Sequence, residues 1–213
     1  MESSDFVGSI TGLAQNIALL LALTLLYSVV RPYWARLSIH LQSLVAGMLF
    51  SLIAAAGMHT PIVVVPGVIA DARVIPVLLA GPFGGPGAAV VAAVLASCYR
   101  VWLGGVGTIA GVGTIVTAGL LGVLIGVRWH GRERDLRPAV LLLFGCALDA
   151  IVLLWALALP EPGLAKRVLT LAAVPVGLFL PLGTLGLGAL LVNESRRHAE
   201  RECVSNRAAS DRW

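Results

Sequence analysis

Residues 66–87 read PGVIADARVIPVLLAGPFGGPG and residues 97–111 read SCYRVWLGGVGTIAG, and these two stretches decide how the chain folds. Each places an arginine, Arg73 or Arg100, among glycines and prolines inside a long apolar region. A charged side chain at bilayer depth is costly, so it usually faces a protein interior or a wet cavity. Broken helices at that depth need partners for their freed backbone groups. A charged side chain and a helix break at the same place therefore predict a binding site.

The composition indicates that lipid surrounds most of the chain. Of the 213 residues, 58% are hydrophobic and 12% are charged, and the mean hydropathy is +0.93. A soluble domain of this length has too little core to hide that much apolar surface. We therefore expect an all-α, polytopic membrane bundle over residues 1–192, followed by a helical cytoplasmic tail over residues 193–213.

The region 62–82 departs from a regular membrane span. After Asp71 only a dozen residues remain before the glycine-rich turn, which gives about 18 Å of helix. A bilayer core is about 30 Å thick. Pro76 also disfavours helix at the residue before it and removes one backbone donor. We predict either a broken span, extended first and helical later, or a re-entrant element paired with residues 86–103.

The distribution of basic residues predicts the orientation. Two lie in residues 31–38, four in residues 128–137 and five after residue 193, so eleven of the fifteen fall on one side. Cytoplasmic loops carry an excess of Lys and Arg, which places the N-terminus outside and the C-terminus inside. Seven crossings fit this parity, and so do five crossings with two re-entrant pieces.

Arg73 and Arg100 are the strongest candidates for a binding role. A guanidinium stays charged and offers a planar fork of donors that matches a carboxylate or a phosphate. Two such forks facing one cavity would suit a small organic anion. Each arginine also has a structural alternative. Arg73 could form a salt bridge with Asp71, unless Asp71 caps the following helix. Arg100 could extend to the membrane interface beside Tyr99 and Trp102.

Other polar groups lie in the apolar segments. Asp149 could serve as a counter-ion to one of the arginines, as a proton relay or as a ligand group, and the sequence leaves these roles open. Thr114 could offer a hydrogen bond to a ligand, although such threonines often bond the preceding helical turn instead. The pairs Gly84–Gly85 and Gly104–Gly105 are expected to bring backbone close to the ligand.

The glycine spacing also predicts close helix packing. The pairs Gly81/Gly85, Gly107/Gly111 and Gly122/Gly126 match the small-xxx-small pattern by which membrane helices approach one another.

Several function classes lack support in the sequence. The four histidines are scattered and the three cysteines have no CxxC spacing, so we predict neither a metal site nor a cofactor. No nucleophile elbow or kinase loop is present, so we expect a protein that is not an enzyme. The net charge of +4 follows the membrane topology and does not indicate nucleic acid.

The two runs PGVIADARVIPVLLAGPFGGP and YRVWLGGVG resemble the LytS-type (LytS–YhcK) five-transmembrane receptor domain. The matching positions are Asp71, Arg73, Pro76, Gly81, Gly84, Gly85, Pro86, Arg100, Gly104 and Gly105. The resemblance implies a sensor domain of the bacterial inner membrane that binds a small extracellular molecule, with small carboxylates among the ligands of the family. It also implies a cytoplasmic histidine kinase or diguanylate cyclase as output, and no such sequence is present in this chain.

Three functions are therefore carried forward. The first is a sensor in which Arg73 and Arg100 clamp a small anion, Asp71 orients Arg73, and a downstream signalling domain receives the signal. A homodimer is compatible with this function, but no sequence feature demonstrates one. The second is the substrate-binding subunit of a small-solute transporter, and the third is a structural membrane protein with its charges paired internally.

Overall fold

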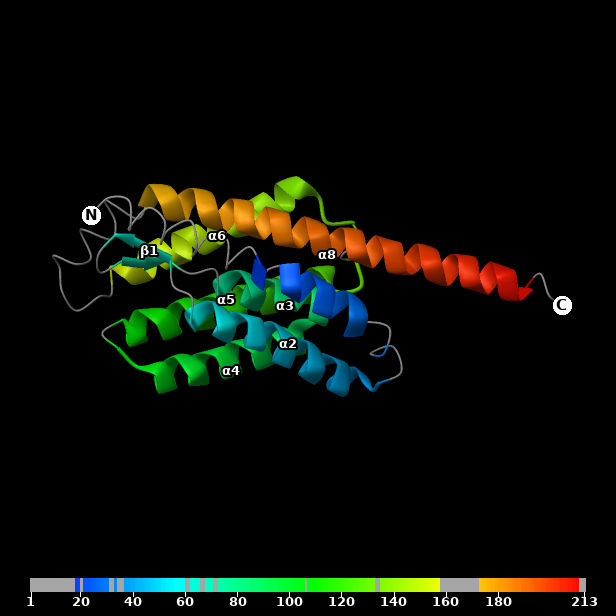
Figure 1. Cartoon of the computed structure of the whole chain (residues 1–213), viewed down its shortest axis with the longest axis horizontal. Coiled ribbons are helices and arrows are strands. Elements are labelled where there is room, and N and C mark those ends of the chain that lie inside the picture. Colours follow the sequence, from blue (N-terminus) through cyan, green and yellow to red (C-terminus); the bar gives the residue numbers. More distant parts are fainter. Residues whose placement is uncertain are drawn as a thin grey trace.

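The computed structural model describes residues 18–19, 21–30, 33, 37–59, 62–65, 68–70, 73–105, 107–132, 135–157 and 173–210. A short apolar helix, Leu21–Val30, comes first. The elements that follow are α2 (Ile39–His59), β1 (Ile62–Val65), β2 (Val68–Ala70), α3 (Val74–Gly84), α4 (Pro86–Leu103), α5 (Thr108–Trp129), α6 (Pro138–Ala156) and α8 (Ala173–Ser210). Figure 1 shows these helices side by side as an elongated bundle, with α8 extending beyond one end. The predicted polytopic helical bundle is confirmed, and the antiparallel pair β1–β2 is its one sheet among the described residues.

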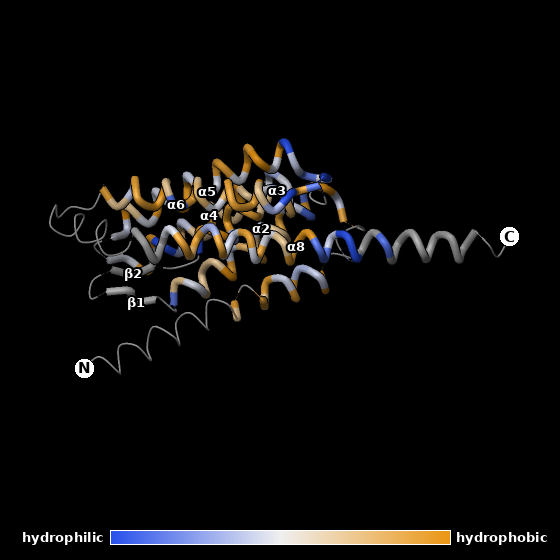
Figure 2. Tube along the Cα trace, turned by 90° about the horizontal axis from the view of Figure 1, so that it is seen from above, coloured by the Kyte–Doolittle hydropathy of each residue, from blue (hydrophilic) through white to orange (hydrophobic). Residues whose placement is uncertain are grey.

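Five helical segments are long and apolar enough to cross a membrane. They are α2, α4, α5, α6 and the segment Gly177–Arg197 of α8. Large apolar side chains on their outer faces are exposed, including Val94, Leu120 and Leu143, which is expected where lipid replaces water. Figure 2 shows apolar residues along the bundle and hydrophilic residues where α8 leaves it. The chain is therefore a multi-pass membrane protein.

The broken element is extended first and helical later, as one of the two predictions stated. The hairpin β1–β2 is followed by α3, which has only 11 residues, all of them buried. The end of α3 at Gly84 packs against Ala46, near the start of α2, whereas α2 itself ends at His59. Helix α3 thus runs back alongside α2, toward the end of the bundle at which α2 begins. Pro76 lies in the first turn of α3, where its missing N–H breaks no helical hydrogen bond.

Glycines allow α3 to pack directly against α5. A Cβ atom added at Gly122 would lie 2.8 Å from the carbonyl oxygen of Leu78, and one added at Gly126 would lie 2.8 Å from that of Gly81. Any side chain at Gly81 would overlap the backbone of Gly122. The small-xxx-small pair Gly122/Gly126 therefore does mediate a helix contact, with Gly81 as its partner on α3.

The helices α6 and α8 form a pair that is attached to the rest of the bundle at few places. Each contacts the other more extensively than it contacts any other helix. A Cβ added at Gly183 of α8 would lie 2.8 Å from the terminal methyl of Ile75 on α3, and one added at Gly113 of α5 would lie 2.5 Å from the indole ring of Trp155 on α6. These two contacts join the pair to α3 and α5.

The α3–α5 contact generates a stability prediction. We expect Gly81→Ala to lower the free energy of unfolding by about 1–3 kcal/mol, because overpacking forces the two backbones apart. Thermal unfolding of the detergent-purified protein measures the effect. Gly57→Ala in α2 is the matched control, since a Cβ there has no neighbour within 4 Å. Equal melting temperatures for the two variants would contradict the packing described above.

Candidate functional site

The two arginines come from different helices and meet beside one glycine of α5. Arg73 directly precedes α3, and Arg100 lies in the last turn of α4. A Cβ added at Gly111 would lie 2.7 Å from Nε of Arg100 and 3.1 Å from an Nη atom of Arg73. The two guanidinium groups are therefore neighbours over the same point of α5, and the Nε atoms of both are buried.

The local backbone explains why Arg100 turns inward. The turn that follows α4 contains Gly104 with φ 70° and Gly105 with φ 102°, a conformation that side chains rarely adopt. An Nη atom of Arg100 donates a 2.9 Å hydrogen bond to the carbonyl oxygen of Gly104. A cation at this place also interacts favourably with the C-terminal end of the helix dipole. The same side chain thus closes the turn and directs its Nε toward Gly111.

Thr114 lies one turn after Gly111 and supports the backbone of the site. Its hydroxyl group is buried and donates a 2.8 Å hydrogen bond to the carbonyl oxygen of Gly111. Thr117 bonds the carbonyl of Gly113 in the same way, at 2.7 Å. The hydroxyl oxygen of Thr114 still has lone pairs with which it could accept a hydrogen bond.

Neither of the two acidic residues that the sequence analysis named, Asp71 and Asp149, is seen beside the arginines in the described residues. Asp71, which we expected to orient Arg73 or to cap α3, lies outside the described residues. Asp149 was a predicted partner for Arg73 or Arg100, but its carboxylate faces Gly177 of α8 instead, 3.4 Å from the position of an added Cβ. Within the described ranges, no ion pair joins Asp149 to either arginine.

The glycines named by the sequence analysis fall into two groups. Gly104 and Gly105 form the turn beside the arginines. Gly84 and Gly85 lie at the other end of α3, about 16 Å along the helix from Arg73. There Gly84 packs against Ala46, and a Cβ added at Gly85, where φ is 92°, would lie 3.4 Å from the ring of His130. The structure therefore does not bring this second pair to the arginines.

Gly111 is the residue of the site that sequence reasoning missed. Its spacing from Gly107 was noticed only as a packing pattern, whereas its absent side chain is what makes room for both guanidinium groups. A glycine facing the positions of two intramembrane arginines would have been the signal, but it requires knowing which helix faces they share.

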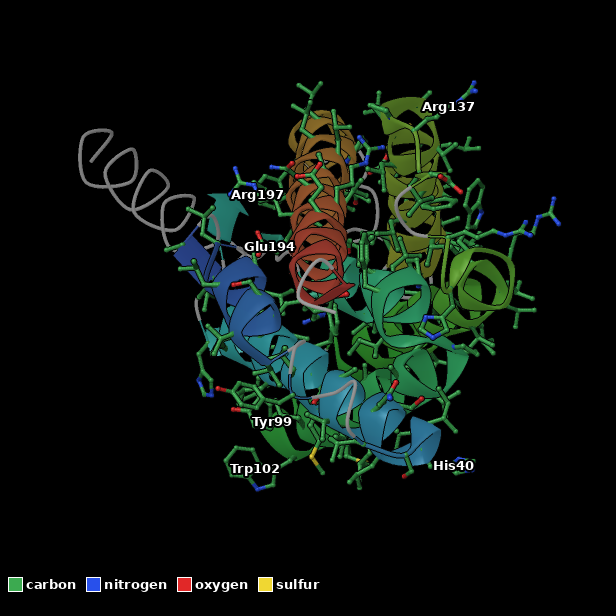
Figure 3. The ribbon with its side chains drawn as sticks, turned by 90° about the vertical axis from the view of Figure 1, so that its right-hand side faces the viewer. His40, Tyr99, Trp102, Arg137, Glu194 and Arg197 are labelled. Carbon is green, nitrogen blue, oxygen red and sulfur yellow. The ribbon has the colours of Figure 1, made fainter. Side chains whose placement is uncertain are left out.

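Aromatic residues flank the site at the end of the bundle. His59 and Tyr99 are joined by a hydrogen bond between the imidazole and the phenol, and the ring centroids of Tyr99 and Trp102 are 5.6 Å apart. Figure 3 shows Tyr99 and Trp102 at the periphery of the bundle, and Trp102 is 76% exposed. These side chains suit a membrane interface. Arg100, however, points toward α5 rather than outward with them.

The fold and the site define a multi-pass membrane protein with two arginines that converge beside a short, buried helix. The family model described as the 5TMR of 5TMR-LYT matches residues 29–194. The chain belongs to this family of LytS-type five-transmembrane receptor domains. No curated protein and no solved structure was found to match the chain.

The hydrogen bond from Arg100 generates a second prediction. We expect Arg100→Ala to speed amide hydrogen exchange in residues 104–108, because the α4–α5 turn loses its charged donor. A hydrogen bond to a charged group contributes about 1.5–3 kcal/mol, and local opening governs exchange. Arg128→Ala, an exposed arginine in the last turn of α5, is the control and should leave this segment unchanged. Unchanged exchange in Arg100→Ala would contradict a structural role in the turn.

Proposed function

We propose that this chain is the sensor domain of a signalling protein of the bacterial inner membrane, and that it binds a small organic anion at Arg73 and Arg100. Small carboxylates are the first ligand class to test. The convergence of the two guanidinium groups on Gly111 is the observation that supports the proposal. Membership of a five-transmembrane receptor family supports sensing, without specifying the ligand.

The chemistry of the site suits a carboxylate. Each guanidinium offers parallel N–H donors that match two carboxylate oxygens. Because the surroundings are apolar, an anion between two cations interacts with them more strongly than it would in water. The turn at Gly104 and Gly105 carries no side chains and allows backbone to approach the ligand. In this proposal Asp71 orients Arg73.

The signal would leave through α8. Ile75, two residues after Arg73, packs on Gly183, and α8 continues from there to Ser210. A ligand shifts an equilibrium between two packings only by its difference in affinity for them. We propose that the anion favours one position of α3 and that α8 passes this choice to a cytoplasmic histidine kinase or diguanylate cyclase, within a homodimer. The chain itself would then be a receptor and not an enzyme.

Ligand binding can be tested by thermal shift of the purified protein with acetate, lactate, succinate and phosphate. A ligand at 100 times its Kd adds about 2.7 kcal/mol to the stability of the folded state. We expect at least one anion to stabilise the wild type and Arg128→Ala, and to have no effect on Arg73→Ala or Arg100→Ala. A shift that persists in both site variants would refute the clamp. Uptake of the labelled anion by cells expressing the chain would favour the transporter-subunit alternative.

The proposed orientation is tested by labelling introduced cysteines with a membrane-impermeant maleimide. Cys98, Cys146 and Cys203 are first replaced by serine. We expect Thr108→Cys to be labelled in intact cells, because the site should open outward, and Arg132→Cys only after permeabilisation, because its loop belongs to the basic side. The reverse pattern would place the arginine pair on the cytoplasmic side.

A further inference from the structure

Asp149 forms a second polar site, which the arginine pair does not use. It lies in the middle of α6, among apolar residues that span the membrane. One carboxylate oxygen, Oδ1, is buried and has no hydrogen-bond partner in the part of the chain that the structure describes. The other, Oδ2, faces α8 at Gly177. An ionised carboxylate in such a place is costly unless a donor or a cation compensates it.

The segment of α8 that faces Asp149 contains a proline, Pro181. Pro181 lies inside α8, four residues after Gly177. Proline has no N–H group, so the carbonyl oxygen of Gly177 cannot accept the regular helical hydrogen bond from residue 181. Gly145, one turn before Asp149 on α6, packs directly against Pro181. The pair Gly145 and Asp149 therefore faces the pair Pro181 and Gly177. The carboxyl group thus faces a residue whose carbonyl oxygen lacks its regular donor.

Charged groups on the neighbouring helices do not neutralise this carboxylate within the described residues. Arg128 is the charged residue of α5 and lies in its last turn, at the other end of the bundle. Arg73, just before α3, and Arg100, on α4, face Gly111. In α8 the first charged residue is Glu194, beyond the apolar segment, and Asp149 is the charged residue of α6. The connection between α6 and α8, which contains Glu161, Lys166 and Arg167, lies outside the described residues.

We propose that Asp149 is a proton-binding site whose protonated carboxyl group donates a hydrogen bond to the carbonyl oxygen of Gly177, thereby joining α6 to α8. The carboxylate takes one proton from water, and no other bond changes. A metal cation fits less well, because one carboxylate and one carbonyl supply too few oxygen ligands. An ionised carboxylate would instead face the negative end of the carbonyl dipole in an apolar medium, so loss of the proton weakens the contact between the two helices.

Infrared spectroscopy of the protein in detergent tests the protonation state directly. We expect the carbonyl stretching band of a protonated carboxylic acid at neutral pH in the wild type. The band should disappear in Asp149→Asn and persist in Glu194→Gln, the control carboxylate on α8. In Pro181→Ala the backbone N–H is restored and competes for the carbonyl of Gly177, so the band should move toward the frequency of a weakly bonded acid.

Stability measurements supply an independent readout. Asn keeps an N–H donor for the Gly177 carbonyl, whereas Leu does not, so Asp149→Asn should melt near the wild type and above Asp149→Leu at neutral pH. Because the folded state holds a proton that the unfolded state releases, raising the pH should lower the melting temperature of the wild type relative to Asp149→Asn. If the acid band is absent at neutral pH, or if Asp149→Asn does not remove it, the proposal is wrong. The anion screen described above involves other residues, so either proposal can fail alone.

Discussion

The contact of α3 with α5 is the constraint on which the other features depend. Eleven residues of α3 are buried inside the bundle because Gly122 and Gly126 let its backbone touch that of α5. Dispersion contacts at such short range are a main source of helix association in lipid, where no hydrophobic effect drives helices together. This contact also fixes the depth at which α3 begins. Since Arg73 directly precedes the first turn, the same packing positions its guanidinium over Gly111.

A second consequence concerns electrostatics. Two unit charges of like sign about 5 Å apart repel by about 3 kcal/mol at an effective dielectric constant of about 20. In the proposed function, an anion bound between the two guanidinium groups relieves this repulsion. The Arg100 hydrogen bond to Gly104 and the dipole of α4 hold part of this charge in place. The packing of α3 on α5 holds the two guanidinium groups at this place, which explains why the site is built on rigid helices and a glycine turn.

The sequence predicted the fold better than it predicted the grouping of residues at the site. The apolar runs and the basic loops identified a membrane bundle, and Pro76 with the short run after Asp71 identified a span that is extended before it is helical. These are local properties, readable from spacing. The separation of Gly85 from Arg73 was also readable from spacing, because the dozen residues between Asp71 and the glycine-rich turn already implied about 18 Å of helix. Which helix faces meet is not local: the convergence of Arg73 and Arg100 on Gly111 depends on how α3, α4 and α5 pack. Likewise, Asp149 faces α8 because Gly145 and Pro181 set the packing of α6, and this partnership leaves no signature in either segment alone.

Helix α8 contacts residues at or near both polar sites of the bundle. Through Gly183 it touches Ile75, close to the arginine pair, and through Gly177 it touches Asp149. The two contacts are six residues apart on one helix, with Pro181 between them. A helix that lacks a backbone hydrogen bond at this point bends at lower cost than a regular one. Coupling between two binding sites is reciprocal by thermodynamic necessity. Anion binding that moves α8 at Gly183 would act on the same stretch of helix as protonation of Asp149. Protonation would then change the anion affinity by a certain factor, and the anion would change the proton affinity by the same factor.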